Sequence, residues 1–427
     1  MPSVALYNLG CSKNIVDGER IVHLFKDAGY SIVQEFAGAE VIVVNTCAFI
    51  REAQEEAIEA ILESSQWKSK GRCTKLLVSG CFSERYRERV RKLFPEVDLW
   101  VGVRDWETVL AKELAVPSVS PFKRELSSPI TTQFLKIAEG CSHACAFCAI
   151  PNIRGPYHSR LPSEILEEAR WLEAKGTREL ILVAQDTSFY GRDINSNFTR
   201  LLETLLAGTS VPWIRVMYLH PQHVGDALLA LFAGEKRLCP YFDIPLQHIA
   251  DPILKAMGRS PVSKGIRFLL EKIRTAVPTA ALRSSLIAGF PGETEGHFKE
   301  LAAFIEEVRF DRLGVFPYSP EEGTLARAMR GRPRSATVMR RCETLMLVLR
   351  DISREKLAGR VGMVMEVIIE DASDDPSFPL AGRTRFDAPE VDGRVFVARR
   401  HGRHASSPFA QVRITRSSDH DLFGEAL

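Results

Sequence analysis

Three cysteines share one short run, Cys141-Ser-His-Ala-Cys145-Ala-Phe-Cys148. Thiolates at C-x3-C-x2-C spacing can hold three irons of one 4Fe–4S cluster and leave the fourth iron without a protein ligand. An open iron suits a cluster that must bind a substrate or a cofactor. The alternative is a zinc site with His143 as fourth ligand. Zinc sites usually combine two separated ligand pairs, however, and the chain has no second C-x2-C pair. The spacing therefore predicts an iron–sulfur cluster.

Three further cysteines each follow an apolar run near the N-terminus. They are Cys11, Cys47 and Cys81, and Gly10 and Gly80 precede two of them. The carboxyl ends of parallel strands meet at one edge of a sheet, so these thiols should converge although 36 and 34 residues separate them. Glycine lets the backbone turn tightly beside them. The convergence predicts a second cluster with one open iron; three unrelated strand-end cysteines are the alternative.

The remaining cysteines and the composition indicate an ordinary globular protein. Cys73 precedes its predicted strand, and Cys239 and Cys342 have no partners, so we expect these three to be structural. An odd total of nine cysteines among 427 residues argues against a disulfide framework. Hydrophobic residues make up 45% and charged residues 26%, and the formal net charge of +2 does not indicate a nucleic-acid binder.

The chain shows no signal for a membrane or for export. No apolar stretch approaches the ~20 residues that a membrane helix needs. The N-terminus has neither the basic region nor the cleavage site of a signal peptide. We therefore expect a soluble cytoplasmic protein with no membrane partner.

The elements that must position the N-terminal cysteines alternate between strand and helix over residues 1–120. We expect, in order, strand Val4–Leu9, helix Asn14–Ala28, strand Glu40–Thr46, helix Ala48–Gln66 and strand Lys75–Ser79. Continuous apolar runs are typical of buried parallel strands. The alternation predicts an α/β domain built on a doubly wound parallel sheet. Pro117, Pro121 and Pro129 indicate a linker, which we place at residues 121–131.

From residue 132 to residue 357 the alternation continues through about six strand–helix units. The expected strands are Phe134–Ala138, Glu179–Ala184, Trp213–Tyr218, Tyr241–Leu246, Ala281–Ala288 and Arg312–Phe316. We expect a helix over Ser163–Ala174 with Ser163 as its N-cap, and a long closing helix over Ser335–Leu357. The pattern predicts a partial (β/α)6 barrel with its chemistry at the carboxyl ends of the strands.

Several motifs follow these strands and should face the same rim. Gly289-Phe290-Pro291-Gly292-Glu293-Thr294 follows a predicted strand, and its glycines permit close approach of a ligand; a tight turn with Glu293 entering the next helix is the alternative. Gln185-Asp186-Thr187 and Gln247-His248 follow other strands. His248 could donate a proton, but we favour a hydrogen-bonded structural histidine.

Residues 358–427 have a different character from the rest. Short runs rich in Val and Ile alternate with Gly, Pro and Asp, which predicts a small antiparallel β barrel or sandwich. Nine arginines and no lysine stand against eleven acidic residues, a formal charge of −2, whereas a domain that grips RNA should be basic. Arg394, Arg399, Arg400 and Arg403 could still form a local basic patch. Residues 371–404 contain no motif that we can assign.

The run Cys141 to Cys148 after the first strand of a partial barrel resembles the radical S-adenosylmethionine enzymes. In that superfamily S-adenosylmethionine chelates the open iron, and one electron from the cluster splits it into methionine and a 5′-deoxyadenosyl radical. The resemblance implies that Phe147 lies near the adenine, with an ordinary core aromatic as the alternative. It also implies that Gly289, Pro291 and Gly292 form part of the wall of the S-adenosylmethionine site.

Two open-iron clusters followed by a small β domain resemble the methylthiotransferases, whose terminal domain is called TRAM. Short motifs are similar to the ribosomal-protein branch of that family; they begin at Gly10, Cys148, Ala184, Ile244 and Asp421. The transfer RNA branch usually has Gln-Met-Asn after the first cysteine, where this chain has Ser-Lys-Asn.

The resemblance implies an enzyme that inserts a methylthio group at the β-carbon of an aspartate in the twelfth small-subunit ribosomal protein. Its cofactors would be two 4Fe–4S clusters and S-adenosylmethionine, and the six cysteines of the two trios would be the metal ligands. Its partners would be that ribosomal protein, free or on the ribosomal subunit, and a flavodoxin-type reductant, but not transfer RNA. The alternatives are a methylthiotransferase acting on an adenosine of transfer RNA, and a non-catalytic iron–sulfur or zinc module that binds RNA.

Overall fold

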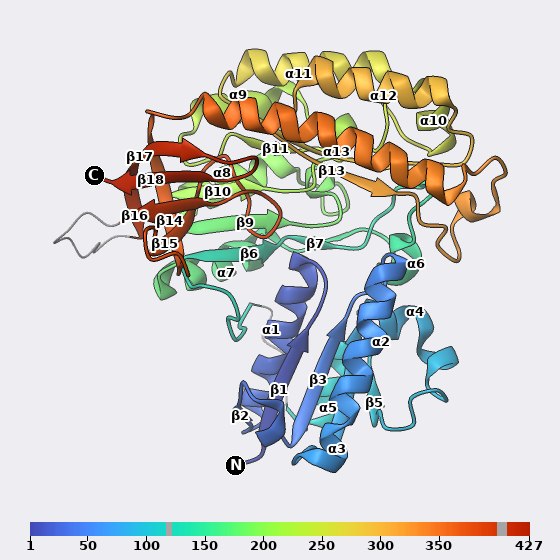
Figure 1. Ribbon diagram of the computed structural model, residues 1–427. Coiled ribbons are helices and arrows are strands. Elements are labelled where there is room, and N and C mark those ends of the chain that lie inside the picture. Colours follow the sequence, from blue (N-terminus) through green and yellow to red (C-terminus); the bar gives the residue numbers. More distant parts are fainter. Residues whose placement is uncertain (117–121, 399–407) are drawn as a thin grey trace.

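The computed structural model describes residues 1–116, 122–398 and 408–427. Three units of sheet structure follow one another along the chain; Figure 1 shows the blue N-terminal sheet beneath the central barrel and the red terminal barrel at one side. Within the described ranges no helix has the length and apolarity needed to cross a membrane. Pro117 and Pro121 of the expected linker, and Arg399, Arg400 and Arg403 of the alternative basic patch, lie outside the described residues.

The N-terminal unit is a parallel sheet in the order β2-β1-β3-β4-β5, which confirms the doubly wound prediction. Its elements are β1 (Ser3–Asn8), α1 (Ser12–Asp27), β2 (Ser31–Ile32), β3 (Val41–Thr46), α2 (Arg51–Ser65), α3 (Trp67–Lys70), β4 (Lys75–Gly80), α4 (Cys81–Val90), β5 (Leu99–Trp100) and α5 (Trp106–Glu113). Side chains alternate across a strand. Val41 and Val43 therefore join the core beside α1 and α5, while Ile42 and Val44 join the core beside α2.

The central unit contains six parallel strands in two three-stranded sheets. They are β6 (Thr132–Lys136), β9 (Glu179–Val183), β10 (Trp213–Val216), β11 (Tyr241–Asp243), β12 (Ala281–Ala288) and β13 (Arg312–Pro317). The sheets join where the backbone N–H of Leu219 donates to the carbonyl of Asp243 over 2.8 Å. Among the described residues the outer strands β6 and β13 do not pair with each other. The result is the predicted partial barrel.

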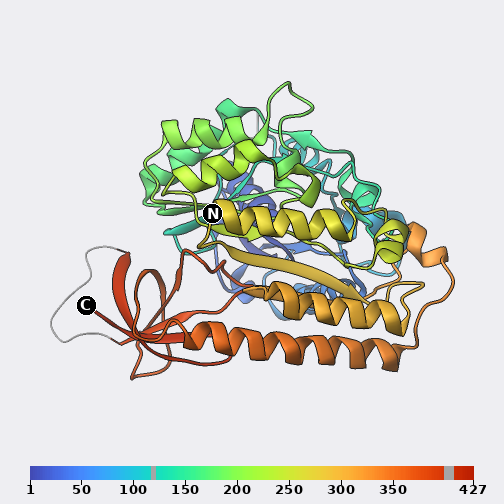
Figure 2. The same ribbon diagram turned by 90° about the horizontal axis from the view of Figure 1, so that it is seen from above.

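Helices cover the outside of this barrel (Figure 2), and two helix starts differ from the sequence prediction. The elements between and after the strands are β7 (Ala138–Glu139), α6 (Ile150–Arg154), β8 (His158–Ser159), α7 (Pro162–Lys175), α8 (Phe198–Gly208), α9 (Asp226–Gly234), α10 (Asp251–Ala256), α11 (Ser263–Ala276), α12 (Glu295–Val308) and α13 (Ser335–Ala358). Leu161, not Ser163, is the N-cap of α7, because Pro162 takes the first helical position, where a missing N–H costs no hydrogen bond. Glu293 precedes α12, whose N-cap is Thr294.

The terminal unit is a closed five-stranded barrel in the order β14-β15-β16-β18-β17. Its strands are β14 (Val364–Ala372), β15 (Leu380–Thr384), β16 (Val395–Ala398), β17 (Phe409–Ser417) and β18 (Leu422–Ala426). Neighbouring strands are antiparallel except for β16 and β18, which pair in parallel. Closure leaves no free strand edge. The long helix α13 runs along the central unit and leads into this barrel (Figure 2).

The segment between β15 and β16 closes the central barrel where its strands begin. Phe386 belongs to the same apolar cluster as Tyr241, the first residue of β11. Asp387 accepts a hydrogen bond from Arg312 over 2.6 Å, and Asp392 accepts one from the Tyr241 hydroxyl over 2.6 Å. Part of the region without an assignable motif therefore serves as a plug at the amino ends of the strands.

One buried carboxylate ties this terminal unit to the central strands. Glu179 of β9 is fully buried and accepts hydrogen bonds from Arg215 of β10 over 2.7 Å and from Arg383 of β15 over 2.6 Å. Burial opposes its ionisation, but the two guanidinium groups outweigh burial and lower the pKa of Glu179. Charge-assisted bonds of this kind are stronger than neutral ones, so Glu179 fixes where the terminal barrel sits.

We expect Glu179→Ala to lower the free energy of unfolding by about 3 kcal/mol, because it leaves buried guanidinium charge without its carboxylate. Urea denaturation followed by circular dichroism measures the change. Glu203→Ala, at an exposed position of α8, is the matched control and should behave like the unchanged protein. Equal urea midpoints for the two variants would show that Glu179 does not carry this role.

Candidate active site

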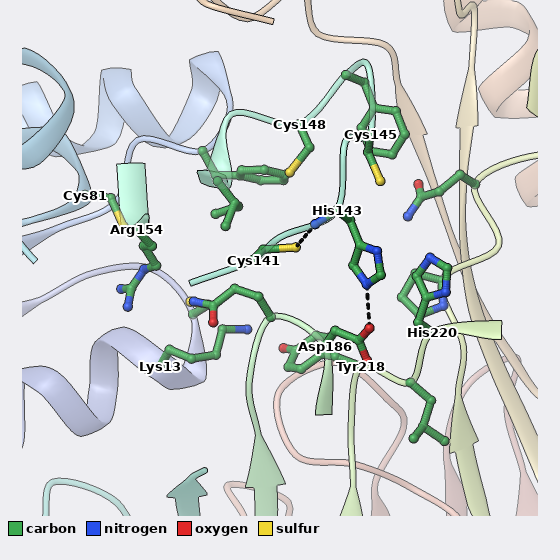
Figure 3. A pocket seen from close by; sticks show the side chains of 18 of the residues that line it. Lys13, Cys81, Cys141, His143, Cys145, Cys148, Arg154, Asp186, Tyr218 and His220 are labelled. Atoms are coloured by element: carbon green, nitrogen blue, oxygen red, sulfur yellow. Dashed lines mark hydrogen bonds and ion pairs between the residues drawn. The ribbon is translucent and has the colours of Figure 1, made fainter. Parts of the chain in front are cut away.

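All six predicted cluster cysteines line one cavity of about 360 Å³: Cys11, Cys47, Cys81, Cys141, Cys145 and Cys148. Other lining residues follow β9 (Gln185, Asp186), β10 (Tyr218, Leu219, His220) and β11 (Pro245, Gln247). The carboxyl edge of the N-terminal sheet therefore faces the carboxyl ends of these central strands across the cavity (Figure 3). The sequence predicted two clusters, and the structure brings the ligands of both to one cavity. Each trio offers three thiols, a donor set that fits a 4Fe–4S cluster with one open iron.

The N-terminal trio converges at the point where the strand order of its sheet reverses. Cys11 follows β1 and Cys47 follows β3, and ligands of open α/β sheets bind in the crevice between such strands. At Gly10 (φ +92°) a Cβ would lie 2.8 Å from the Cβ of Cys47, and at Gly80 (φ +96°) it would overlap the backbone of Thr46. Only glycine combines this backbone conformation with such close contacts. Both glycines therefore let the cysteine loops approach each other, as the sequence predicted.

The loop that carries the other trio lies between β7 and α6 and is anchored to distant segments. The backbone N–H of Cys141 donates to the carbonyl of Gly155 over 3.0 Å. The N–H of Ala146 donates to the carbonyl of Met257, beyond α10, over 2.9 Å. These bonds hold the run from both sides, so its thiols face the cavity in a fixed arrangement.

Burial and nearby cations set the ionisation of the thiols in opposite directions. Burial raises the pKa of Cys81 and of Cys148 to about 12. At Cys11 burial also acts to raise the pKa, but the Lys13 ammonium and the Arg154 guanidinium outweigh it and lower the pKa below its ordinary value. Cys81 and Cys148 are therefore protonated at neutral pH, and iron that binds them must displace protons.

Four charged side chains, three of them buried and Glu139 partly exposed, form a cluster where the N-terminal unit meets the barrel. Arg154 of α6 lies 3.2 Å from Asp17 of α1 and 2.8 Å from Glu139 of β7. Lys136 of β6 pairs with the same two carboxylates. Burial opposes the charge of Glu139, but Arg154 and Lys136 hold its pKa well below the usual range. This cluster, with two cations and two anions, locks the two units together beside the cavity.

Two histidines share one carboxylate oxygen on the opposite wall. The Nε2 of His143 lies 2.7 Å and the Nδ1 of His223 3.1 Å from the Oδ2 of Asp186. These bonds, together with one from Ser188, outweigh burial and hold the pKa of Asp186 well below the usual range. Figure 3 shows the ring of His143 directed to Asp186. This contact occupies the Nε2 of His143 and fixes the orientation of its ring.

The same wall groups four residues of metal-ligating types. The ligand atoms of His143, Asp186, His220 and His223 lie within 4.8 Å of one another. The rings of His143 and His220, however, stack with their centroids 4.3 Å apart at an angle of 13°. An imidazole binds a metal in its own plane, so two stacked rings do not share one ion. Burial lowers the pKa of His220 to about 2, which keeps it neutral. We interpret the group as a hydrogen-bonded polar wall.

The residues predicted to contact S-adenosylmethionine lie in two places. Phe147 lines the cavity. Gly289, Pro291 and Gly292 are not among the lining residues, and Phe290 between them packs in the apolar cluster that Phe147 contacts. The turn thus lies behind the aromatic side chain rather than beside the thiols.

Glu293 and His248 have structural positions close to that turn. Glu293 accepts hydrogen bonds from the backbone N–H of Gly289 over 2.9 Å and from Arg341 over 2.6 Å. His248 is fully buried, its Nδ1 accepts from the N–H of Ala250 over 3.0 Å, and its Nε2 lies 3.4 Å from Glu293. The structure confirms a hydrogen-bonded structural histidine.

Gln247, which the sequence placed at the rim, lines the cavity, and so do three residues that the sequence did not single out: Lys13, Tyr218 and Arg259. Tyr218 (φ 60°) and Gln247 (φ 74°) have left-handed backbone conformations, which are strained for residues other than glycine and cluster at functional sites. Lys13 lies over the ring of Tyr218. Arg259 approaches the sulfur of Cys145 to 3.8 Å. The place of Tyr218 after a strand and that of Lys13 beside Cys11 gave a signal in the sequence, whereas Arg259 lies beyond α10 and gave none. Cys73, Cys239 and Cys342 are buried and not among the lining residues.

Three known families match successive parts of the chain. Residues 3–102 match the family described as Uncharacterized protein family UPF0004, residues 135–305 match the Radical SAM superfamily, and residues 361–427 match the TRAM domain. The structure of the radical S-adenosylmethionine methyltransferase TsrM from Kitasatospora setae has a TM-score of 0.57 at 13% identity, over 82% of this chain and 89% of that chain; it shows a shared fold. The chain is thus a radical S-adenosylmethionine protein with a terminal TRAM domain.

Curated relatives match over the whole chain. The ribosomal protein uS12 methylthiotransferase RimO of Alkaliphilus oremlandii is 41% identical over 433 residues, which cover 99% of this chain and 98% of the relative. The RimO protein of Pelobacter propionicus is 41% identical over 440 residues, with 99% and 97% covered. The chain belongs to the family of ribosomal protein uS12 methylthiotransferases. It is therefore an enzyme, a radical S-adenosylmethionine methylthiotransferase, whose cofactors are S-adenosylmethionine and two 4Fe–4S clusters.

We expect Cys11 to be alkylated by iodoacetamide before Cys47 in the iron-free protein at pH 7. Both residues are partly exposed, but the pKa of Cys11 is lowered by Lys13 and Arg154, and that of Cys47 is raised, chiefly by burial. The thiolate is the reactive form. As pH is raised, the alkylation rate of Cys11 should therefore begin to increase at a lower pH than the alkylation rate of Cys47. Peptide mass spectrometry after timed quenching measures both rates. Indistinguishable profiles for the two thiols would contradict this electrostatic assignment.

Proposed function

We propose that this enzyme inserts a methylthio group at the β-carbon of an aspartate in ribosomal protein uS12. The observation that carries the proposal is the single cavity lined by both cysteine trios. A β-carbon bears an unactivated C–H bond that acid–base groups cannot break, so a cofactor must supply the chemistry. Sulfur insertion also needs a sulfur source next to the activated carbon. A space shared by two clusters meets both requirements for one substrate side chain.

In this proposal each trio of cysteines holds one cluster. Cys141, Cys145 and Cys148 would hold the cluster that binds S-adenosylmethionine, and Cys11, Cys47 and Cys81 would hold the one that carries sulfur. When bound, these groups supply a hydrogen-abstracting radical, the inserted sulfur and a methyl group. Phe147 would lie beside the adenine, while Gly289, Pro291 and Gly292 would support that site from behind Phe147.

The protein's own residues supply enclosure and charge. Phe49, Leu219 and Pro245 give the cavity apolar walls, which help to exclude water from reactive intermediates. Arg259, whose Nη1 lies 3.8 Å from the sulfur of Cys145, offers positive charge beside thiolates. The anchored cysteine loops hold both trios in fixed positions, which favours reaction by orientation.

The terminal barrel suits a protein substrate better than transfer RNA. Several of its described arginines are committed to contacts within the chain. Arg383 pairs with buried Glu179, Arg385 donates to backbone carbonyls after α9, and Arg394 pairs with Asp371 over 2.5 Å. Binding to nucleic acid draws much of its affinity from cations free to neutralise phosphates. A flavodoxin-type protein would deliver the electrons, and the enzyme would act in the cytoplasm on uS12, free or on the ribosomal subunit.

The substrate is tested by offering reduced, cluster-loaded enzyme both purified uS12 and unmodified transfer RNA. We expect mass spectrometry to find one methylthio group on an aspartate of uS12. Methylthioadenosine in the RNA with no modified protein would instead support the transfer RNA alternative.

We expect the two trios to have separable roles. Cys148→Ala should abolish the production of 5′-deoxyadenosine, because a cluster left with two protein ligands is labile. Replacing Cys11, Cys47 and Cys81 together by alanine should remove about four irons and stop methylthiolation, yet preserve 5′-deoxyadenosine production. Iron analysis and chromatography of the products measure both effects.

Cys342→Ala is the matched control for these variants, because Cys342 is buried and not among the cavity-lining residues. It should keep about eight irons and full activity. A triple variant that retained all its iron would refute the second cluster, and one that still methylthiolated uS12 would refute its sulfur-carrying role.

A further inference from the structure

Lys13, the second residue of α1, places a nearly buried ammonium group in the cavity. Its exposed fraction is 8%, and it lies among the lining residues beside Cys11. Its Nζ lies 3.7 Å from the centre of the Tyr218 ring. Figure 3 shows the side chain extending from α1 toward Tyr218. The side chain therefore crosses from the N-terminal sheet to the rim of the barrel.

No carboxylate among the described residues pairs with Lys13. Its neighbours differ in this respect, since Arg154 and Lys136 both pair with Asp17 and Glu139. An aromatic face attracts a cation but leaves its charge uncompensated. The Cys11 thiol beside Lys13 interacts with its charge when that thiol is ionised. No carboxylate does so, and the ammonium group therefore stays able to bind one inside the cavity.

The rest of the fold keeps this ammonium group in place. Tyr218 has a strained backbone (φ 60°), and two contacts hold it there: its N–H donates to Asp243 over 3.0 Å, and its carbonyl accepts from the N–H of Thr187 over 3.1 Å. Strain of this kind persists only where surrounding structure over-determines it, and it clusters at functional sites. The ring that orients Lys13 is therefore itself rigidly placed.

We propose that Lys13 is a positioning residue that binds the side-chain carboxylate of the substrate aspartate, an inference that rests on the proposed function. The carboxylate is bonded directly to the β-carbon, so an ion pair with Lys13 keeps that carbon inside the cavity that both trios line. Arg259, the other lining cation that pairs with no carboxylate in the described chain, lies at Cys145 and donates to the carbonyl of Pro245. On the side of the N-terminal trio, Lys13 is the lining cation that pairs with no carboxylate of the described chain.

The test compares uS12 with a variant in which the modified aspartate is replaced by asparagine, which has the same shape without the charge. Binding to the full-length, cluster-loaded enzyme with S-adenosylmethionine is measured anaerobically by fluorescence anisotropy of labelled uS12. The unchanged enzyme should bind the aspartate form about tenfold more tightly, the scale of a hydrogen bond to a charged group. Lys13→Met and Lys13→Gln should bind both forms equally, and Lys13→Arg should restore part of the preference.

Lys26→Met, on the same helix but exposed and paired with Glu125 outside the cavity, is the matched control and should keep the full preference. Iron content and 5′-deoxyadenosine production without uS12 show whether a Lys13 variant retains its clusters. A merely structural role would change those two quantities and leave the preference for aspartate unchanged.

An unchanged preference in a Lys13 variant with intact clusters would overturn the inference. The substrate change alone also tests it, because equal binding of both uS12 forms by the unchanged enzyme would overturn it even if every Lys13 variant failed to fold. If the unchanged enzyme does not methylthiolate uS12 at all, the proposed function fails first. Methylthiolation of uS12 without a charge preference overturns only the role of Lys13.

Discussion

The buried charge cluster between α1 and α6 is the interaction on which the site depends. Arg154 and Lys136 belong to the central unit, and Asp17, in α1 of the N-terminal unit, pairs with both of them. A buried ion pair adds less stability than apolar packing but can fix one arrangement. Arg154 also donates to Asn14, whose amide group donates to the carbonyls beside the Cys11 and Cys47 loops. The same contact that joins the units thus positions one trio against the other.

The central barrel is closed by different parts of the chain at its two ends. The plug between β15 and β16 fills the end where the strands begin, through Asp387 and Asp392. At the carboxyl ends, α1 brings Val16 into the apolar cluster inside the barrel. A partial barrel cannot enclose a reaction alone, because its outer strands leave one side open. The terminal and N-terminal units therefore complete the enclosure, which explains why one chemical site needs three units.

The alternation of strands and helices, together with the shared carboxyl edge of parallel strands, was enough to predict much of this arrangement. Parallel strands have one carboxyl edge, so the convergence of Cys11, Cys47 and Cys81 followed from the strand order alone. Contacts between two units of the chain do not produce a periodic pattern of residues in the sequence. The pairing of His223 with Asp186, and the partnership of Arg383 with Glu179 across 204 residues, were therefore not predictable. Strands β2 and β5 have two residues each, too few for a pattern.

The charges on the cavity wall explain how neutral thiols and anionic ligands can occupy one space. With protonated sulfur at Cys81 and Cys148, the wall carries Lys13 and Arg259, which pair with no carboxylate among the described residues, and Arg154, which pairs with Asp17 and Glu139. The carboxylate of Asp186 is already engaged by His143 and His223. Lys13 and Arg154 favour the thiolate form of Cys11. Cluster assembly converts neutral thiols to thiolates. The cations beside these thiols are already in place, so they do not have to move when the thiolates form. The wall is thus preorganised for anions before any arrives.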